Sequence, residues 1–210
     1  MEINYLSQDS PDHNIIRESD FINSDGYPFS KCPCWGHKSD RTFIVTSPIN
    51  YSFTSDNPNS EMLFWDDKHL NAPSPVFHMK TPHFLFWTHD SDVWLDVGDH
   101  PMTSLVNNLI TVPGWLQLST WPVKTSFSFV VVDKTKPVVL KKGDPIFRLT
   151  FHSPDLNDEI ILNKIEDSNL INEIQEIYES KREESMDNGT WKDRLFKKGK
   201  SKCPFARIIY

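Results

Sequence analysis

The chain has 210 residues, a net charge of −7 and 38% hydrophobic residues, which is enough apolar material for a packed core and excludes disorder throughout. Its longest apolar runs, such as residues 84–87 and 127–132, fall far short of the roughly 20 residues that a membrane-spanning helix requires. The N-terminus lacks the basic start and apolar run of a secretory signal, and three cysteines are too few for a disulfide framework. We therefore expect a soluble cytoplasmic protein that does not enter a membrane.

The first 41 residues are predicted to form an extended lead-in. Residues 1–30 mix Asp, Asn, Ser and Pro with isolated apolar residues, a composition that predicts no regular element.

Residues 42–162 are predicted to form the core, because short β-branched and aromatic segments alternate there with turn residues. The predicted strands are residues 42–46, 51–54, 62–65, 82–88, 93–97, 105–112, 126–132, 137–140 and 146–151. No helical period interrupts them, so the fold class is mainly β, with an antiparallel sandwich, jelly roll or barrel-like core. Such a sheet has unpaired edge strands, which can pair between two copies of the chain, so a homo-oligomer is one expectation.

A C-terminal helix is predicted within residues 163–190. From Ser168 onward, apolar residues follow a helical period and lie on one face, namely Leu170, Ile171, Ile174, Ile177 and Tyr178. We expect this face to pack on the core, and we expect the helix to end near the Asn188-Gly189 pair.

The last 20 residues, 191–210, form a basic tail. They hold seven Lys or Arg against one Asp, a local charge of +6, which leaves −13 for the other residues. Such a tail can contact a nucleic-acid backbone, an acidic partner or its own acidic domain, or simply stay solvated. Its candidate contact residues are Lys192, Arg194, Lys197, Lys198, Lys200 and Lys202.

Two sets of residues are candidate metal ligands. In the first, the thiols of Cys32, Cys34 and the remote Cys203 and the imidazole of His37 form a zinc-type set, although only Pro33 separates the first two thiols. The second set follows the metal sites of jelly-roll enzymes, which use two His and one carboxylate, and comprises His78, His83, His89 and His152 with Asp90 and Asp92 nearby. If either set of residues comes together, the expected cofactor is zinc or iron. The alternatives are that the cysteines are unligated thiols beside a turn and that the histidines make ordinary hydrogen bonds in loops.

The run Val139–Leu149, with its Lys142-Gly143-Asp144-Pro145 turn, resembles the late hairpin of trimeric dUTPases and related nucleotide-handling β-folds. The likeness covers about a dozen residues, and no other phosphate-binding motif of that family is present. A Gly-Asp turn between two strands accounts for it, so the run predicts a hairpin.

Short motifs in similar order, including Lys31-Cys32-Pro33, Pro113-Gly114 and Phe127-Ser128-Phe129, resemble an uncharacterised family of bacteriophage and bacterial proteins. The resemblance spans roughly residues 31–151. It implies a phage-type origin, with a place in the host cytoplasm or the virion, and no catalytic residue.

These features predict three alternative functions. The first is a non-catalytic binding or structural module, in which Trp115 and Trp121 in exposed loops recognise a protein or carbohydrate ligand. The second is a metal-dependent enzyme or zinc-stabilised protein, and the third is a nucleic-acid-associated accessory protein acting through the tail. No complete catalytic motif supports an enzyme, so the binding module is the leading prediction.

Overall fold

The computed structural model of the chain describes residues 1–8, 14–25, 33–54, 62–65, 76–79, 83–90, 92–100, 106–118, 123–125 and 128–187. The chain divides into two compact units, Met1–Lys164 and Ile165–Tyr210.

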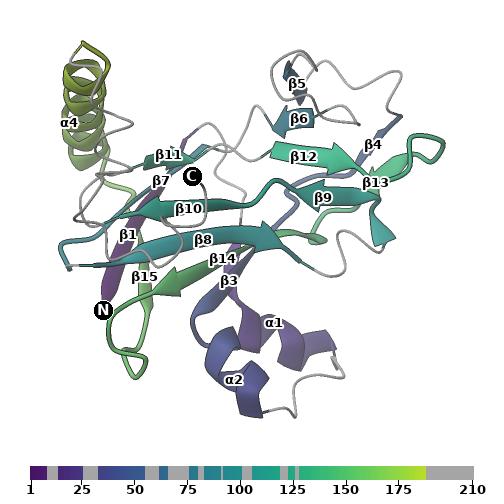
Figure 1. Ribbon diagram of the computed structural model, residues 1–210, viewed down its shortest axis with the longest axis horizontal. Helices are drawn as coiled ribbons and strands as arrows, with labels where there is room; N and C mark the ends of the chain where they lie inside the picture. The colour runs from purple at the N-terminus through teal and green to yellow at the C-terminus, as the bar shows by residue number, and fades with distance from the viewer. Residues whose placement is uncertain are drawn as a thin grey trace, which may run out of the picture. The chain divides into compact units, whose positions relative to one another are not determined.

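The first unit is mainly β, and the strands among its described residues form four sheets (Figure 1). The five-stranded sheet has the order β10 (Gly114–Gln117), β8 (Trp94–Asp99), β14 (Pro145–His152), β3 (Thr42–Thr46) and β2 (Ile15–Arg17). A four-stranded sheet has the order β11 (Val123–Thr125), β7 (His83–Trp87), β1 (Glu2–Gln8) and β15 (Ile161–Lys164). A second four-stranded sheet has the order β5 (Met62–Trp65), β6 (Val76–Met79), β12 (Ser128–Val131) and β9 (Leu109–Thr111), and β13 (Val138–Leu140) pairs with β4 (Tyr51–Phe53).

Aromatic side chains join these sheets into a sandwich-like core. On β14, Phe147, Leu149 and Phe151 are fully buried, as alternation along a strand requires when one face covers the core. Phe151 contacts Phe86 of the β1–β7 sheet with ring centroids 5.9 Å apart, and Phe147 contacts Phe129 of β12 at 6.3 Å. The predicted mainly β, sandwich-like fold is therefore confirmed.

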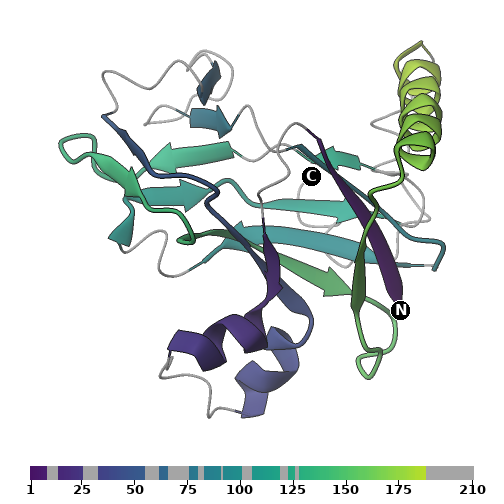
Figure 2. The same ribbon diagram turned by 180° about the vertical axis from the view of Figure 1, so that it is seen from behind.

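Two short helices, α1 (Glu18–Asp25) and α2 (Pro33–Ser39), lie together beside β3 (Figures 1 and 2). The hydroxyl of Thr42, the first residue of β3, donates a hydrogen bond to the carbonyl of Lys38 at 2.8 Å. This bond fixes the end of α2 against the outer face of the five-stranded sheet, the face opposite the core.

The first 30 residues differ from their prediction, because they contribute β1, β2 and α1. β1 lies between β7, with which it pairs antiparallel, and β15, with which it pairs parallel. Its alternate residues Ile3 and Tyr5 are buried in the core. The apolar positions that look isolated in the sequence are thus the inward side of a strand.

The predicted hairpin at Lys142-Gly143-Asp144-Pro145 is wrong in one respect. The turn forms, with a hydrogen bond from the Asp144 amide to the Lys141 carbonyl at 3.0 Å and a φ of 90° at Gly143. However, β13 pairs with β4, whereas β14 pairs with β3 and β8. The turn therefore carries the chain from one sheet to another.

The second unit contains α4 (Ser168–Asp187), which confirms the predicted C-terminal helix. Asp167 caps its N-terminus, since its carboxylate accepts hydrogen bonds from the amides of Asn169 and Leu170 at 2.9 and 3.3 Å. Within the described part of the chain, no helix has the length and apolar character needed to cross a membrane.

Candidate functional site

Polar and aromatic side chains lie in register across the outer face of the five-stranded sheet. The strand registers place Trp115, Asp96, Thr150 and Thr42 opposite one another, in a row across β10, β8, β14 and β3. In the next row, Trp94 lies opposite His152. We call Trp94, Asp96, Trp115, His152 and the nearby Lys38 of α2 the outer-face cluster.

Asp96 and His152 act on each other electrostatically within this cluster. Burial raises the pKa of Asp96, and the positive charges of His152 and Lys38 oppose that rise. Burial also lowers the pKa of His152, and the Asp96 carboxylate opposes that fall, whereas the cations Arg41 and Lys38 add to it. The net lowering favours the uncharged imidazole, which has one ring nitrogen able to accept a proton.

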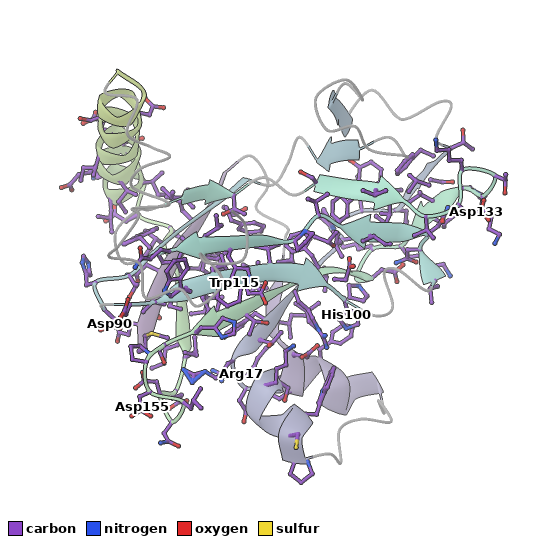
Figure 3. All side chains as sticks on the ribbon, in the orientation of Figure 1. Arg17, Asp90, His100, Trp115, Asp133 and Asp155 are labelled. Carbon is purple, nitrogen blue, oxygen red and sulfur yellow. The ribbon has the colours of Figure 1, made fainter. Side chains whose placement is uncertain are left out.

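The Nε2 atom of His152 is buried and has no hydrogen-bond partner in the described part of the chain. A buried polar atom without a partner costs about 1–3 kcal/mol, so such atoms are rare and call for an explanation. Trp115 stacks on the same imidazole, with ring centroids 5.0 Å apart, and Trp94 lies 6.2 Å from Trp115. Trp115 is 46% exposed and lies on β10, the edge strand of this sheet, where Figure 3 labels it.

A buried ion pair joins α1 to this face. Nε of Arg148 on β14 donates to a carboxylate oxygen of the fully buried Glu18 at 2.6 Å. Burial raises the pKa of Glu18, and Arg148 opposes that rise. The Arg148 guanidinium also lies over the ring of Trp35 in α2, 4.7 Å from its centroid. These contacts hold both helices, and with them Lys38, beside the cluster.

A cleft of about 430 Å³ lies nearby, lined by Arg17, Asp40, Arg41 and residues 156–159. Arg41 donates to the Asp155 carbonyl at 3.0 and 3.1 Å. Arg17 donates to the Asp40 and Ile160 carbonyls at 2.8 and 2.7 Å. Both guanidinium groups thus fasten the loop that follows β14 to the rest of the unit, and we assign them a structural role.

Of the predicted zinc ligands, only Cys34 has a described side chain, which is exposed on α2 as a free thiol. Cys32, Cys203 and the side chain of His37 lie outside the described residues. Where the structure is described, no three His, Cys, Asp or Glu side chains are grouped to hold a metal ion.

The second predicted set is spread over three sheets. His78 lies on β6, His83 begins β7, and His152 ends β14, while His89 is exposed just after β7. The side chains of His78 and His83 are not among those described. His152 therefore enters the candidate site with Asp96 as its partner.

Of the remaining predicted contact residues, the structure describes some and not others. Trp115 belongs to the outer-face cluster, whereas Trp121 and the tail residues Lys192 to Lys202 lie outside the described residues. Sequence reasoning missed Trp94, Asp96 and Lys38. The alternation of buried Val93, Leu95 and Val97 with Trp94 and Asp96 was the available signal, because it places an acidic residue in mid-strand.

No protein-family model matches the chain, and no curated protein matches it significantly. Among solved structures, native EIAV dUTPase matches with 11% identity and a TM-score of 0.39, over 75% of this chain and 97% of that one. A mutant dUTPase of Staphylococcus bacteriophage 80alpha matches with 9% identity and a TM-score of 0.34, over 71% and 96%. A mutant dUTPase of the S. aureus phage phi11 matches with 9% identity and a TM-score of 0.34, over 70% and 95%.

These matches contradict the prediction of a non-catalytic binding or structural module, since the solved structures that the chain resembles are enzymes. The predicted membership of an uncharacterised phage and bacterial family stays a prediction.

Proposed function

We propose that the chain is a hydrolase that cleaves a phosphate bond in a nucleotide, with the outer-face cluster as its active site. The single observation that carries this proposal is the unpartnered Nε2 of His152 beside Asp96. A neutral imidazole next to a carboxylate is suited to general-base catalysis, because the carboxylate stabilises the imidazolium that forms when a proton is taken up.

In the proposed reaction, Nε2 of His152 accepts a proton from a water molecule whose oxygen attacks a phosphorus atom of the substrate. The P–O bond to the leaving phosphate breaks, and its electron pair stays on the leaving oxygen. His152 then returns the proton to that oxygen. The net change is the addition of one water molecule across the P–O bond.

Two further groups account for a nucleotide as the substrate class. Lys38 is exposed, and its charge affects both Asp96 and His152, so its ammonium is placed to meet an anionic phosphate. Trp115 supplies an aromatic surface on which a planar base can stack. Because Nε2 is shielded from solvent, the site must open as the substrate binds, and the half-exposed Trp115 on the edge strand β10 is the cluster residue best placed to move.

The test is a hydrolysis assay of the full chain with a panel of nucleoside triphosphates, with and without Mg²⁺, by release of phosphate or pyrophosphate. The panel includes dUTP, after the dUTPases compared above. We expect Asp96→Asn and His152→Gln each to lower kcat at least 100-fold, the size of effect that general-base groups usually have.

The matched controls are Asp90→Asn and His89→Gln, which alter the same residue types at exposed positions after β7. We expect both to keep wild-type turnover. Activity that survives both cluster substitutions, or a wild-type chain that cleaves none of the panel under either condition, would overturn the proposal.

A further inference from the structure

We infer that the open space above Gly98 is the subsite for the uncharged base of the nucleotide. This inference rests on the proposed function and deepens it, because it assigns the ring-binding part of the same face. Gly98 lies on β8, two residues from Asp96 on the same side of the strand.

The missing side chain of Gly98 leaves a hollow in the outer face. A Cβ atom placed there would meet no atom within 4 Å among the described residues, although Gly98 lies in mid-sheet opposite Arg148. On the other side, β10 begins at Gly114, which pairs with Val97, so the strand pairing ends before Gly98 and no β10 residue lies opposite it. A glycine at such a strand position lets a ligand approach the backbone closely.

The groups around the hollow suit a neutral planar ring. Asp96 precedes Gly98 on β8, His100 follows directly after the end of β8, and Arg148 stands opposite Gly98. Because Glu18 offsets the charge of Arg148, the hollow does not attract a second anion. His100 is fully buried and packs edge-on against Phe21 of α1, with ring centroids 5.8 Å apart; Figure 3 shows His100 on the side of the sheet where the two short helices lie.

Hydrogen-bonding groups and an aromatic wall complete the subsite. The Asp96 carboxyl can meet an N–H group at the edge of a base. Trp115 stands opposite Asp96 and is a diagonal neighbour of Gly98, within reach of a ring that lies over the glycine. The nucleobase thus binds over Gly98, and the phosphates extend towards His152 and Lys38.

The test compares Gly98→Val with Gly114→Val. Gly114 is the matched control, because it lies on the adjoining strand on the opposite face, and a Cβ there also meets no described atom within 4 Å. We would measure calorimetrically the binding of deoxynucleosides, which lack phosphate, and of tripolyphosphate, which lacks a base. Thermal unfolding of both variants verifies that they fold.

We expect Gly98→Val to weaken deoxynucleoside binding at least 10-fold and to leave tripolyphosphate binding unchanged, while Gly114→Val changes neither. Deoxynucleoside binding that Gly98→Val does not weaken, or a wild-type chain that binds tripolyphosphate and no deoxynucleoside, would overturn the inference. Failure of the proposed function is distinguishable, since Asp96→Asn and His152→Gln would then leave turnover intact whatever the Gly98 variants do.

Discussion

The indole of Trp115 and the imidazole of His152 stack with their planes 15° apart and their centroids separated by 5.0 Å, although the two residues lie on different strands with β8 between them. The stack covers an imidazole whose Nε2 has no hydrogen-bond partner in the described residues. Trp115 therefore covers one face of the proposed base, so removing the indole should expose the imidazole to water.

Trp115→Ala should raise the pKa of His152 towards 6.5, because burial is the main cause of its lowering. An NMR titration of the His152 ring resonances in the full chain measures this change directly. Trp115→Phe is the control, since a phenyl ring can keep the stack. A pKa that is the same in the wild type and in Trp115→Ala would show that the indole does not bury the imidazole.

The stability of the chain should depend on His100 below neutral pH. Burial lowers the pKa of His100 from 6.5 to about 4. The unfolded state therefore binds more protons than the folded state between these pH values, so stability is full above pH 6.5 and is lost as pH falls towards 4. The shift corresponds to about 3 kcal/mol.

His100→Gln removes this titration, so its free energy of unfolding should fall less steeply than that of the wild type between pH 6.5 and 4. Urea unfolding at a series of pH values gives both slopes. The raised pKa of Glu18 acts in the opposite direction in both proteins and does not affect the comparison. Parallel slopes would exclude His100 as the source.

Removing only one charge of the Glu18–Arg148 ion pair should lower the free energy of unfolding. Glu18→Gln leaves the guanidinium, whose side chain is 11% exposed, without its counter-ion, which costs about 3–5 kcal/mol at buried sites. The double variant Glu18→Leu with Arg148→Met removes both charges and should recover most of that loss. Urea unfolding measures all three, and a double variant less stable than Glu18→Gln would contradict this account.

Gly143 and Gly36 should respond to alanine with opposite signs. Gly143→Ala should destabilise the chain by about 1–2 kcal/mol, because a φ of 90° is unfavourable for a residue with a Cβ. Gly36→Ala, within α2 and with no described atom within 4 Å of the added Cβ, should stabilise it by up to about 1 kcal/mol. Thermal unfolding distinguishes the two, and equal shifts would refute the conformational argument.

The strands from Thr42 onward could be predicted because their alternation is local. Phe147, Leu149 and Phe151 alternate with Arg148, Thr150 and His152, and this period of two is visible without knowledge of the partner strands. β1 could not be recognised in the same way, because it is stabilised by pairing with β7 and β15, some 80 and 160 residues further along the chain.

The candidate site depends even more on distant contacts. Glu18 and Arg148 are 130 residues apart, and Asp96 and His152 come together only through the register of β8 and β14. Motif reasoning grouped His152 with three other histidines because they share a residue type. Strand pairing instead gave it a carboxylate partner and an aromatic cover, neither of which a spacing pattern contains.

The pH dependence of kcat/KM for nucleotide hydrolysis tests the central claim most directly. The account predicts that kcat/KM falls with decreasing pH through a pKa below 6.5, the lowered pKa of His152, and that this limb disappears from the residual activity of His152→Gln. An acid limb that is unchanged in His152→Gln would contradict the assignment of His152 as the general base.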